Sequence, residues 1–425
     1  MSKRKMYGLL AFILFTFGLL ALVIRFEIKG YPWDGEGKNN SIEGDLASVP
    51  GQEEETTPAK AQDSTSAKAQ ENTSAPDGAA QNPAEGTKSG DSDTSKDGSD
   101  QSGNDNKPGE EEDKDIHLFF GGDIYLSDAV AGIYKKKGIT GILDDSLLNA
   151  MKTADIAMVN QEFTFSTGGK AAEDKQYTFR VNPDYVSAFK DMGIDVVTLA
   201  NNHSMDFGTD ALKDSFDTLK AAGISYVGAG NNLSEARTIH YVQEHGKTLA
   251  FLAASRVIPV PEWNATKAKA GMLTTYDPAL LLEDIKTAKE NSDYVIVYLH
   301  WGVERMQTPK DYQRNLAKQY IDAGADLVIG SHPHVLQGVE YYKGKPIIYS
   351  LGNYIFYSNI KSTAVLKVTL DKELNTKIQL LPAYAYNGKT QLLNDSEKIR
   401  EFYDYMKSIS FDVNFGESGY ASATQ

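Results

Sequence analysis

The chain has 425 residues and carries 43 Lys and Arg residues against 58 Asp and Glu residues, a net charge of −15 at pH 7. It contains no cysteine, which excludes disulfide bonds, thiolate zinc sites and cysteine nucleophiles. A fold without disulfides depends on the size of its core, which suits a large domain.

The first 30 residues predict a membrane anchor. Three basic residues (Lys3, Arg4 and Lys5) precede an uncharged run, Met6 to Ile24, which meets Arg25. A run of this length crosses a bilayer core of roughly 30 Å as a helix, and basic residues before it predict a cytoplasmic N-terminus. No small-x-small motif closes the run, so we expect a single-pass signal-anchor at the cell membrane, with a long cleaved signal peptide as the alternative. Everything after the anchor is then extracellular.

Residues 31–115 predict a disordered acidic linker. From Pro50 to Asp115 there is no Val, Ile, Leu, Met, Phe, Tyr or Trp, so this stretch cannot bury enough apolar surface to offset the entropy of ordering it. Tyr31 to Asp115 holds 21 acidic residues against 7 lysines, which is nearly the whole net charge of the chain. A polar coil of about 80 residues spans roughly 50 Å. The acidic runs therefore indicate a solvated spacer that lifts a domain away from the membrane, and not a metal or partner site.

The remaining residues predict an α/β fold, with a domain over 116–360 and two strands and a helix over 361–425 that complete it. Short β-branched or aromatic runs predict strands, and longer amphipathic runs predict helices. Thr209 is the expected N-cap of one helix and Gly223 its C-terminal stop. The strands are expected within 116–123, 155–162, 194–203, 224–230, 247–257, 293–302, 325–334, 345–356, 364–370 and 377–383, and the helices within 144–154, 182–193, 209–223, 278–292, 311–324 and 396–408. Alternating strands and helices favour helices packed on sheet faces.

Polar side chains stand at the ends of five predicted strands. They are Asp123, Glu162, Asn202 with His203, His300, and His332 with His334. Each has an ordinary explanation by itself, as a turn residue or a packed histidine. In open α/β sheets, however, ligands bind beyond the carboxyl ends of the strands. We therefore expect these side chains to meet at one rim.

The expected ligands are oxygen and imidazole groups without sulfur, a set that suits Mn, Fe, Zn or Mg. They exceed the needs of one tetrahedral zinc ion. They suit two divalent metal ions about 3.5–4 Å apart, with a carboxylate between them, which activate a water and stabilise an anionic transition state. The chemistry that fits is hydrolysis of a phosphate ester, with hydrolysis of an amide as second choice.

Six motifs in this order carry a family resemblance: "GGD" at Asp123, "NQEFTFS" at Glu162, "LANNHSMDFG" at His203, "HWGVE" at His300, then "GSHPHVLQGVE" and "YSLGNYIF". The chain resembles the CapA/PgsA family of poly-γ-glutamate capsule proteins, whose domain is similar to calcineurin-type metallophosphatases. The resemblance implies a four-layer α/β/β/α sandwich. It also implies a role in synthesis or export of a γ-linked glutamate polymer, as a membrane-attached partner of synthase subunits, with an anionic polymer or a phosphoester as substrate.

The resemblance also implies roles for individual residues. The metal ligands would be Asp123, Glu162 as the bridging acid, Asn202, His300, His332 and His334. His203 would protonate a leaving group, with Asp206 beside it. Tyr125, Trp301, Glu304 and Asn353 would support the ligands or face the substrate, and Asp206 or Glu304 would fix the tautomer of an imidazole. Tyr125 stands where metallophosphatases usually have a histidine, so one metal position is expected to be weaker or differently filled.

The loop that carries His332 and His334 is expected to be rigid, because Pro333 stiffens the spacer while Gly330 gives the backbone room to turn.

Three functions remain open at this point. They are a metal-dependent hydrolase, a scaffold or polymer-handling subunit, and a surface domain that kept the fold without the function. A nucleic-acid role lacks support, since the folded part has no basic run.

Overall fold

The computed structural model describes residues 114–357 and 359–424. They belong to one compact unit, Ser99–Gln425. The predicted signal-anchor and acidic linker lie outside the described residues. Within the described ranges, none of the helices is both long and apolar enough to span a bilayer.

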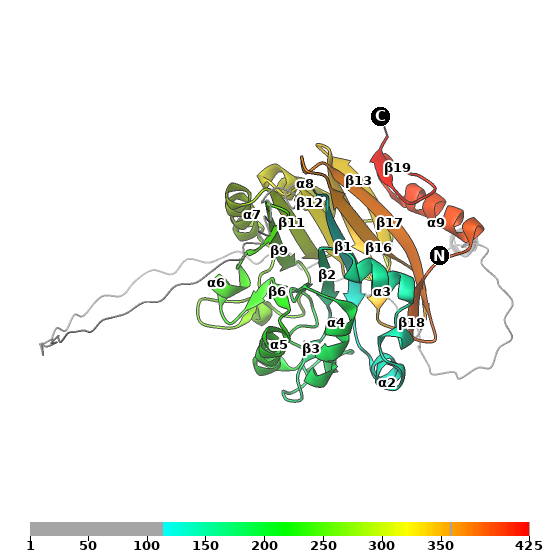
Figure 1. Cartoon of the computed structure of the whole chain (residues 1–425). Helices are drawn as coiled ribbons and strands as arrows, with labels where there is room; N and C mark the ends of the chain where they lie inside the picture. The colour runs from blue at the N-terminus through cyan, green and yellow to red at the C-terminus, as the bar shows by residue number, and fades with distance from the viewer. Residues whose placement is uncertain (1–113, 358, 425) are drawn as a thin grey trace, which may run out of the picture. The chain divides into compact units, whose positions relative to one another are not determined.

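Two large β-sheets organise this part of the chain (Figure 1). The first has the strand order β18-β17-β16-β1-β2-β5-β6, and β15 also pairs with β1; the second has the order β13-β14-β12-β11-β9-β8. In the first sheet β1, β2, β5 and β6 are parallel, and in the second β9, β11, β12 and β14 are parallel. Parallel strands bring their carboxyl ends to the same edge of a sheet, which is where the predicted polar residues stand.

The bounds of the strands in the first sheet are β1 (Ile116–Ile124), β2 (Ile156–Gln161), β5 (Val196–Thr198), β6 (Ser225–Val227), β15 (Asn353–Ile355), β16 (Ile360–Leu370), β17 (Thr376–Tyr386) and β18 (Lys389–Leu392). Those of the second are β8 (His240–Glu244), β9 (Lys247–Ser255), β11 (Tyr294–His300), β12 (Leu327–Ser331), β13 (Leu336–Tyr342) and β14 (Lys345–Leu351). Short pairs are β3 (Thr164–Phe165) with β4 (Arg180–Val181), β7 (Ala229–Gly230) with β10 (Gly271–Met272), and β19 (Val413–Phe415) with β20 (Ala421–Ala423).

The two sheets face each other, and helices cover their outer faces. Successive side chains of a strand point to opposite faces, so in β1 Phe119 packs toward the helices while Phe120 packs toward the second sheet. The first sheet is covered by α3 (Asp145–Lys152), α4 (Val186–Met192) and α5 (Gly208–Ala222), and the second by α7 (Ala279–Asn291) and α8 (Asp311–Ala323). The order of the layers is therefore helices, sheet, sheet and helices.

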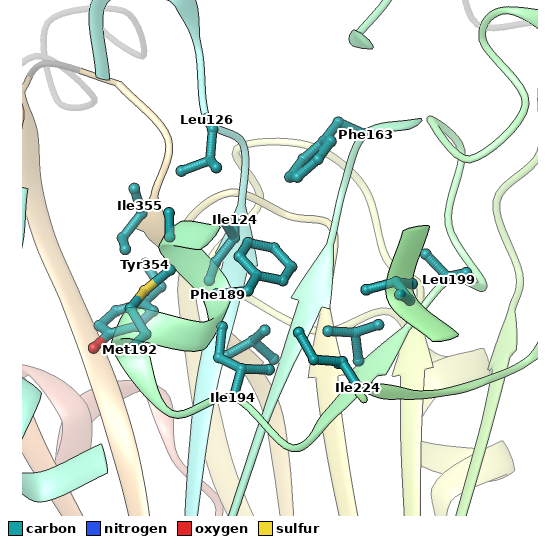
Figure 2. Packing of buried hydrophobic residues seen from close by; sticks show 14 of the residues in the cluster. Ile124, Leu126, Phe163, Phe189, Met192, Ile194, Leu199, Ile224, Tyr354 and Ile355 are labelled. Atoms are coloured by element: carbon teal, nitrogen blue, oxygen red, sulfur yellow. The ribbon is translucent and has the colours of Figure 1, made fainter. Parts of the chain in front are cut away.

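The core under the first sheet supports the strand ends that carry the predicted ligands. Figure 2 shows Ile124, the last residue of β1, and Phe163, which follows β2, near the ring of Phe189 of α4 in this cluster, with Leu126 above Ile124. Ile124, Phe163 and Phe189 are fully buried. Because Ile124 and Phe163 directly follow Asp123 and Glu162, their packing fixes the backbone that presents both acids.

The segment after residue 360 belongs to the same layers. β16 pairs antiparallel with β1 and β17 pairs with β16. Helix α9 (Ser396–Ile409) packs beside β13 and places Phe402, Tyr403 and Met406 in the core between the two sheets. The first sheet therefore depends on strands from both ends of the described chain.

Some local expectations were wrong. Helix α5 begins at Gly208 after Phe207 and has no side-chain cap, so Thr209 is not its N-cap; Gly223 does end it, in the left-handed conformation. Strand β5 ends at Thr198, so Asn202 and His203 lie in the turn that follows it. The unpredicted elements include α2 (Asp128–Lys137), α6 (Leu233–Ala236), β8 and β13, and the short 3-10 helices Ile139–Gly141 and Pro261–Trp263. The 3-10 helix Pro183–Tyr185 begins the helix expected within 182–193 and continues into α4.

Candidate metal centre

Asp123 lies at the end of β1 between two neighbouring strands. It is fully buried, and in the strand register it stands opposite Asn160 of β2 and Asn353 of β15. Asn160 Nδ2 donates a hydrogen bond to Asp123 Oδ1 at 2.8 Å, and the backbone N–H of His332 donates to Oδ2 at 3.3 Å. These contacts fix the direction of the carboxylate and join the first sheet to the loop after β12.

Glu162 occupies the middle of the rim. It is fully buried, and neither of its carboxylate oxygens accepts a hydrogen bond from the described part of the chain. Oε1 lies 3.4 Å from His300 Nε2, and Oε2 lies 3.8 Å from His334 Nδ1. Burial, reinforced by the charge of Asp123, raises the pKa of Glu162 well above its usual value. A buried carboxylate without donors is costly, so this position suits a cation.

The predicted ligands form two groups that share one residue. Ligand atoms within 4.8 Å of one another come from Glu162, His300 and His332 in one group, and from Asp123, Glu162 and His334 in the other. The two histidines of the loop after β12 thus belong to different groups. A carboxylate common to two groups has the position of a bridging ligand between two ions. The residues therefore suit divalent metal, with Glu162 available to both groups.

The imidazoles of His300 and His332 are held against each other and against an amide. His300 Nε2 lies 3.1 Å from His332 Nδ1 and 2.8 Å from Asn202 Oδ1. Burial, together with the neighbouring histidines, lowers the pKa of both imidazoles well below the usual value. A neutral imidazole is the form that binds a metal ion, so both rings have the protonation state that a ligand needs.

His334 has a different electrostatic environment. Burial alone would lower its pKa, but the carboxylates of Glu162 and Asp123 outweigh burial and raise the pKa to about 10. Its Nδ1 lies 3.4 Å from Asp123 Oδ2 and 2.8 Å from Asn353 Oδ1.

The loop from β12 to β13 has an uncommon backbone. His332 has φ 96° and His334 has φ 57°, a region that residues with a Cβ rarely adopt. Such strain persists where the surrounding structure enforces it, often at functional sites. The role expected for Gly330 was wrong, because Gly330 lies within β12 and a Cβ there would stand 2.0 Å from the carbonyl oxygen of Tyr349. The missing Cβ of Gly330 allows β14 to approach β12 closely, and the positive φ angles of the turn occur at His332 and His334.

His203 and Asp206 form a hydrogen-bonded pair beside the two groups. His203 Nδ1 lies 2.6 Å from Asp206 Oδ2, and the backbone N–H of Phe179 donates to the same oxygen at 2.6 Å. The Phe179 ring stacks on the imidazole at 4.0 Å between centroids. Burial lowers the pKa of His203, and Asp206 opposes this effect. The structure places Asp206 where it fixes the tautomer of His203.

The sequence analysis did not predict three residues that lie in this site. Asn160 Nδ2 lies 3.3 Å from His300 Nδ1 as well as bonding Asp123, and Asn201 Nδ2 donates to Asn160 Oδ1 at 3.0 Å. Lys175 contacts Asn202, His203 and Asp206 from a loop. Strand alternation puts Asn160 on the same face as Glu162, which is a signal that could have identified it. The position of Lys175 has no such signal, because it depends on the path of the loop.

Three of the predicted residues make no hydrogen bond or ion pair with the predicted ligands in the described part of the chain. Tyr125 stacks on Phe179 at 4.1 Å in an aromatic cluster. Trp301 does not face the substrate side, because its indole is fully buried under α8 and donates to the carbonyl oxygen of Tyr349. Glu304 is exposed and hydrogen-bonds no imidazole of the described chain, although its charge acts on Glu162 and Lys175. Asn353 contacts His334.

Comparisons with known proteins find relatives of this chain. A family model described as "Bacterial capsule synthesis protein PGA_cap" matches residues 117–358. The "PGA biosynthesis protein CapA" of Bacillus subtilis is 34% identical over 269 residues, 62% of this chain and 70% of that protein. The "Capsule biosynthesis protein CapA" of Bacillus anthracis is 34% identical over 245 residues, 56% of this chain and 59% of that protein. Among solved structures, the NAD nucleotidase of Haemophilus influenzae has a TM-score of 0.38 at 13% identity, covering 70% of this chain and 57% of that one.

Proposed function

This chain belongs to the PGA_cap family of bacterial capsule synthesis proteins, and we propose that it is a membrane-anchored, extracytoplasmic member with a two-metal hydrolytic centre. It would act in synthesis or export of poly-γ-glutamate and hydrolyse a phosphoester or a γ-glutamyl bond. The observation that carries the proposal is Glu162, a fully buried carboxylate without hydrogen-bond donors that is shared by two groups of ligand atoms.

The residues divide into two sets around Glu162. His300, His332 and the amide of Asn202 would hold one divalent ion, and Asp123 and His334 the other. Two bound ions would lower the pKa of a water and stabilise negative charge on the reacting group. This metallophosphatase-like assignment is supported by the four layers and by the position of the ligands at the carboxyl ends of parallel strands.

The chain's own residues supply the proton transfer. His203 Nδ1 is engaged by Asp206, so the free nitrogen of the ring is Nε2. At this atom His203 would exchange a proton with the leaving group of the substrate. Asn160 and Asn353 orient Asp123 and His334, which keeps the ligand directions fixed when substrate enters.

The membrane anchor and the partners are supported by the sequence. The uncharged run Met6–Ile24 after three basic residues supports a single-pass anchor, and the acidic linker supports a domain held away from the lipid. A tethered domain has a high local concentration near other membrane components. We therefore propose synthase subunits of the polymer pathway as partners and an anionic polymer or a phosphoester as substrate.

A second candidate function is a scaffold or polymer-handling subunit without catalysis. Tyr125 favours it, because the residue that stands in place of the usual histidine is stacked on Phe179 in an aromatic cluster. In that case the bound ions would be structural or would bind an anionic chain.

The two candidates are separated by metal analysis and a hydrolase screen on the purified full-length chain. Probes are bis(p-nitrophenyl) phosphate and γ-glutamyl-p-nitroanilide, in the presence of Mn, Fe, Zn or Mg. The hydrolase proposal expects about two ions per chain and turnover that Glu162→Gln abolishes, while the control Glu373→Gln, at an exposed acid between β16 and β17, keeps both. Absence of metal, or unchanged turnover in Glu162→Gln, would refute the hydrolase. Bound metal without turnover, in a chain that still restores capsule to a deletion strain, would favour the scaffold.

A further inference from the structure

The ammonium group of Lys175 lies inside the candidate centre, although it comes from the loop between β3 and β4. Its side chain is only 14% exposed. Nζ contacts the backbone oxygen of Asn202 and Asp206 Oδ1, lies 3.1 Å from His203 Nδ1, and is 5.1 Å from the centroid of the Trp263 ring. A charge buried to this extent needs compensation by hydrogen-bonded partners. The position of Lys175 is therefore specified by the segment from Asn202 to Asp206.

Lys175 completes the hydrogen bonding of Asp206. The Asp206 carboxylate is fully buried. Its Oδ1 accepts a hydrogen bond from Lys175, and its Oδ2 lies 2.6 Å from both the Phe179 N–H and His203 Nδ1. An ionised carboxylate only accepts hydrogen bonds. The proton between Asp206 and His203 therefore lies on Nδ1, and Nε2 is the nitrogen left to face a substrate. Without the ammonium group, Oδ1 would lose its partner inside the protein.

The same loop also holds the ring of His203 from its face. The backbone N–H of Ala172 donates to the carbonyl oxygen of Asp206 at 2.7 Å, and Phe179 stacks on the imidazole. The loop thus contacts the segment from Asn202 to Asp206 through two backbone N–H groups, one ring and one ammonium group. Among these contacts Lys175 alone carries a charge and alone touches Asn202, His203 and Asp206 together.

We propose that Lys175 is a positioning residue that fixes the Asp206–His203 pair as a proton-transfer unit next to the metal ligand Asn202. This inference rests on the proposed function and narrows its substrate class. A firmly held proton donor is useful for a leaving atom that is poor as an anion, such as an ester oxygen or an amide nitrogen. The substrate class that this donor suits is therefore an ester or an amide of this kind.

Three variants of the full-length chain test the proposal. Lys175→Met keeps the length of the side chain and removes the charge, Lys175→Arg keeps the charge, and Lys170→Met is the matched control, since Lys170 lies on the same loop in an exposed ion pair with Glu173. Turnover is compared for p-nitrophenyl phosphate, whose leaving group needs no proton, and for phenyl phosphate. Metal content is measured for each variant.

We expect Lys175→Met to lower kcat for phenyl phosphate by about 100-fold and for p-nitrophenyl phosphate by about 10-fold or less, with metal content unchanged. Lys175→Arg should recover part of the loss, and Lys170→Met should match the wild type. An equal loss on both probes, or a loss that follows metal content, would mean that Lys175 only supports the structure, and would overturn the proposal.

A second readout does not depend on activity. The chain has 7 histidines, so ¹⁵N-histidine NMR can resolve the Nδ1 proton of His203, assigned by its loss in His203→Gln. Lys175→Met should shift this resonance or remove it, whereas Lys170→Met should leave it in place. An unchanged resonance would overturn the positioning role. If wild type hydrolyses neither these two esters nor γ-glutamyl-p-nitroanilide while the resonance responds to Lys175→Met, the proposed hydrolysis fails and the positioning of His203 stands.

Discussion

His300 Nε2 lies 3.4 Å from Glu162 Oε1, and both groups are buried. This separation exceeds the usual 2.7–2.9 Å or so of a charge-assisted hydrogen bond. It is close to the roughly 3.4 Å between two ligand atoms that each lie about 2.1 Å from one tetrahedral metal ion. The described chain thus holds the two atoms at the spacing of shared ligands.

The first prediction follows from Glu162. Glu162→Gln should lower the affinity for Mn²⁺ or Zn²⁺ by at least about 100-fold, because it removes the shared ligand of both groups. The same change should stabilise the metal-free chain by about 1–3 kcal/mol, because it removes a buried carboxylate that has no hydrogen-bond donor. Isothermal titration calorimetry and thermal unfolding with and without a chelator measure the two effects.

Chelation provides the matching test on the wild type. Removal of metal should lower the Tm of the wild type and leave Glu162→Gln nearly unaffected, since only the first binds ions in the folded state. A wild-type Tm that does not respond to chelator or to added Mn²⁺ would contradict a metal centre at this rim.

The second prediction concerns Tyr125. Its ring stacks on Phe179, which in turn stacks on His203, and its hydroxyl makes no hydrogen bond to a described residue. Tyr125→Phe should therefore leave metal content and stability within about 0.5 kcal/mol of the wild type. Tyr125→Ala should cost about 2–4 kcal/mol through the lost aromatic packing. Loss of metal in Tyr125→Phe would show that the phenol is a ligand after all.

The third prediction uses two glycines with different surroundings. A Cβ at Gly330 would lie 2.0 Å from the Tyr349 carbonyl oxygen and 2.4 Å from Trp301 Nε1, whereas a Cβ at Gly132 in α2 would meet nothing within 4 Å. Gly330→Ala should destabilise the fold by about 3 kcal/mol or more, because β12 and β14 must separate. Gly132→Ala should stabilise it by about 0.5–1 kcal/mol through helix propensity. Urea unfolding followed by circular dichroism compares the pair.

The fourth prediction is a pH dependence away from the candidate centre. Glu340 on β13 accepts two hydrogen bonds from Arg314 of α8, at 2.9 and 3.1 Å, and pairs with Lys318 at 2.9 Å. Burial alone would raise the pKa of Glu340, but these partners and the hydroxyl of Tyr349 together lower it. Because the pKa is lower in the folded state, the stabilisation is present above the unfolded pKa of about 4.3 and is lost as pH falls through the folded pKa.

Glu340→Gln should therefore destabilise the chain by about 2–3 kcal/mol at pH 7, and the difference should shrink steadily below about pH 4. Glu373→Gln is the control, since Glu373 is exposed and its ion pair with Lys372 spans 3.9 Å. Glu373→Gln should change the free energy of unfolding by less than about 0.5 kcal/mol, both at pH 7 and at about pH 3. A Glu340→Gln penalty that is equal at pH 7 and pH 3 would contradict this account of the pair.

The α/β class could be predicted from the sequence because apolar periodicity is a local property. The runs from Ile116 and from Tyr294 are strands as expected, and the last helix begins at Ser396. Weakly periodic stretches gave no such signal, so α2 and β13 were not predicted. The N-cap at Thr209 was wrong because the turn before α5, which carries His203, places Phe207 at that position.

The ligand types of the candidate centre were readable because polar residues at the ends of apolar strands stand out from their neighbours. The sequence did not predict which of these residues belong to the same ligand group. That His332 joins His300 while His334 joins Asp123 depends on the left-handed backbone at both histidines. The burial of Trp301 depends on how the residues after β11 pack under α8. The burial of the Lys175 side chain beside Asp206 depends on how the loop after β3 packs.

The sequence by itself determined which chemical groups this chain possesses and at which strand ends they stand, since composition and periodicity are written along the polymer. Only the tertiary structure decided which groups meet. The distances between Glu162, His300 and His334 depend on how two sheets face each other and on one strained loop, and these are contacts between segments far apart in the chain.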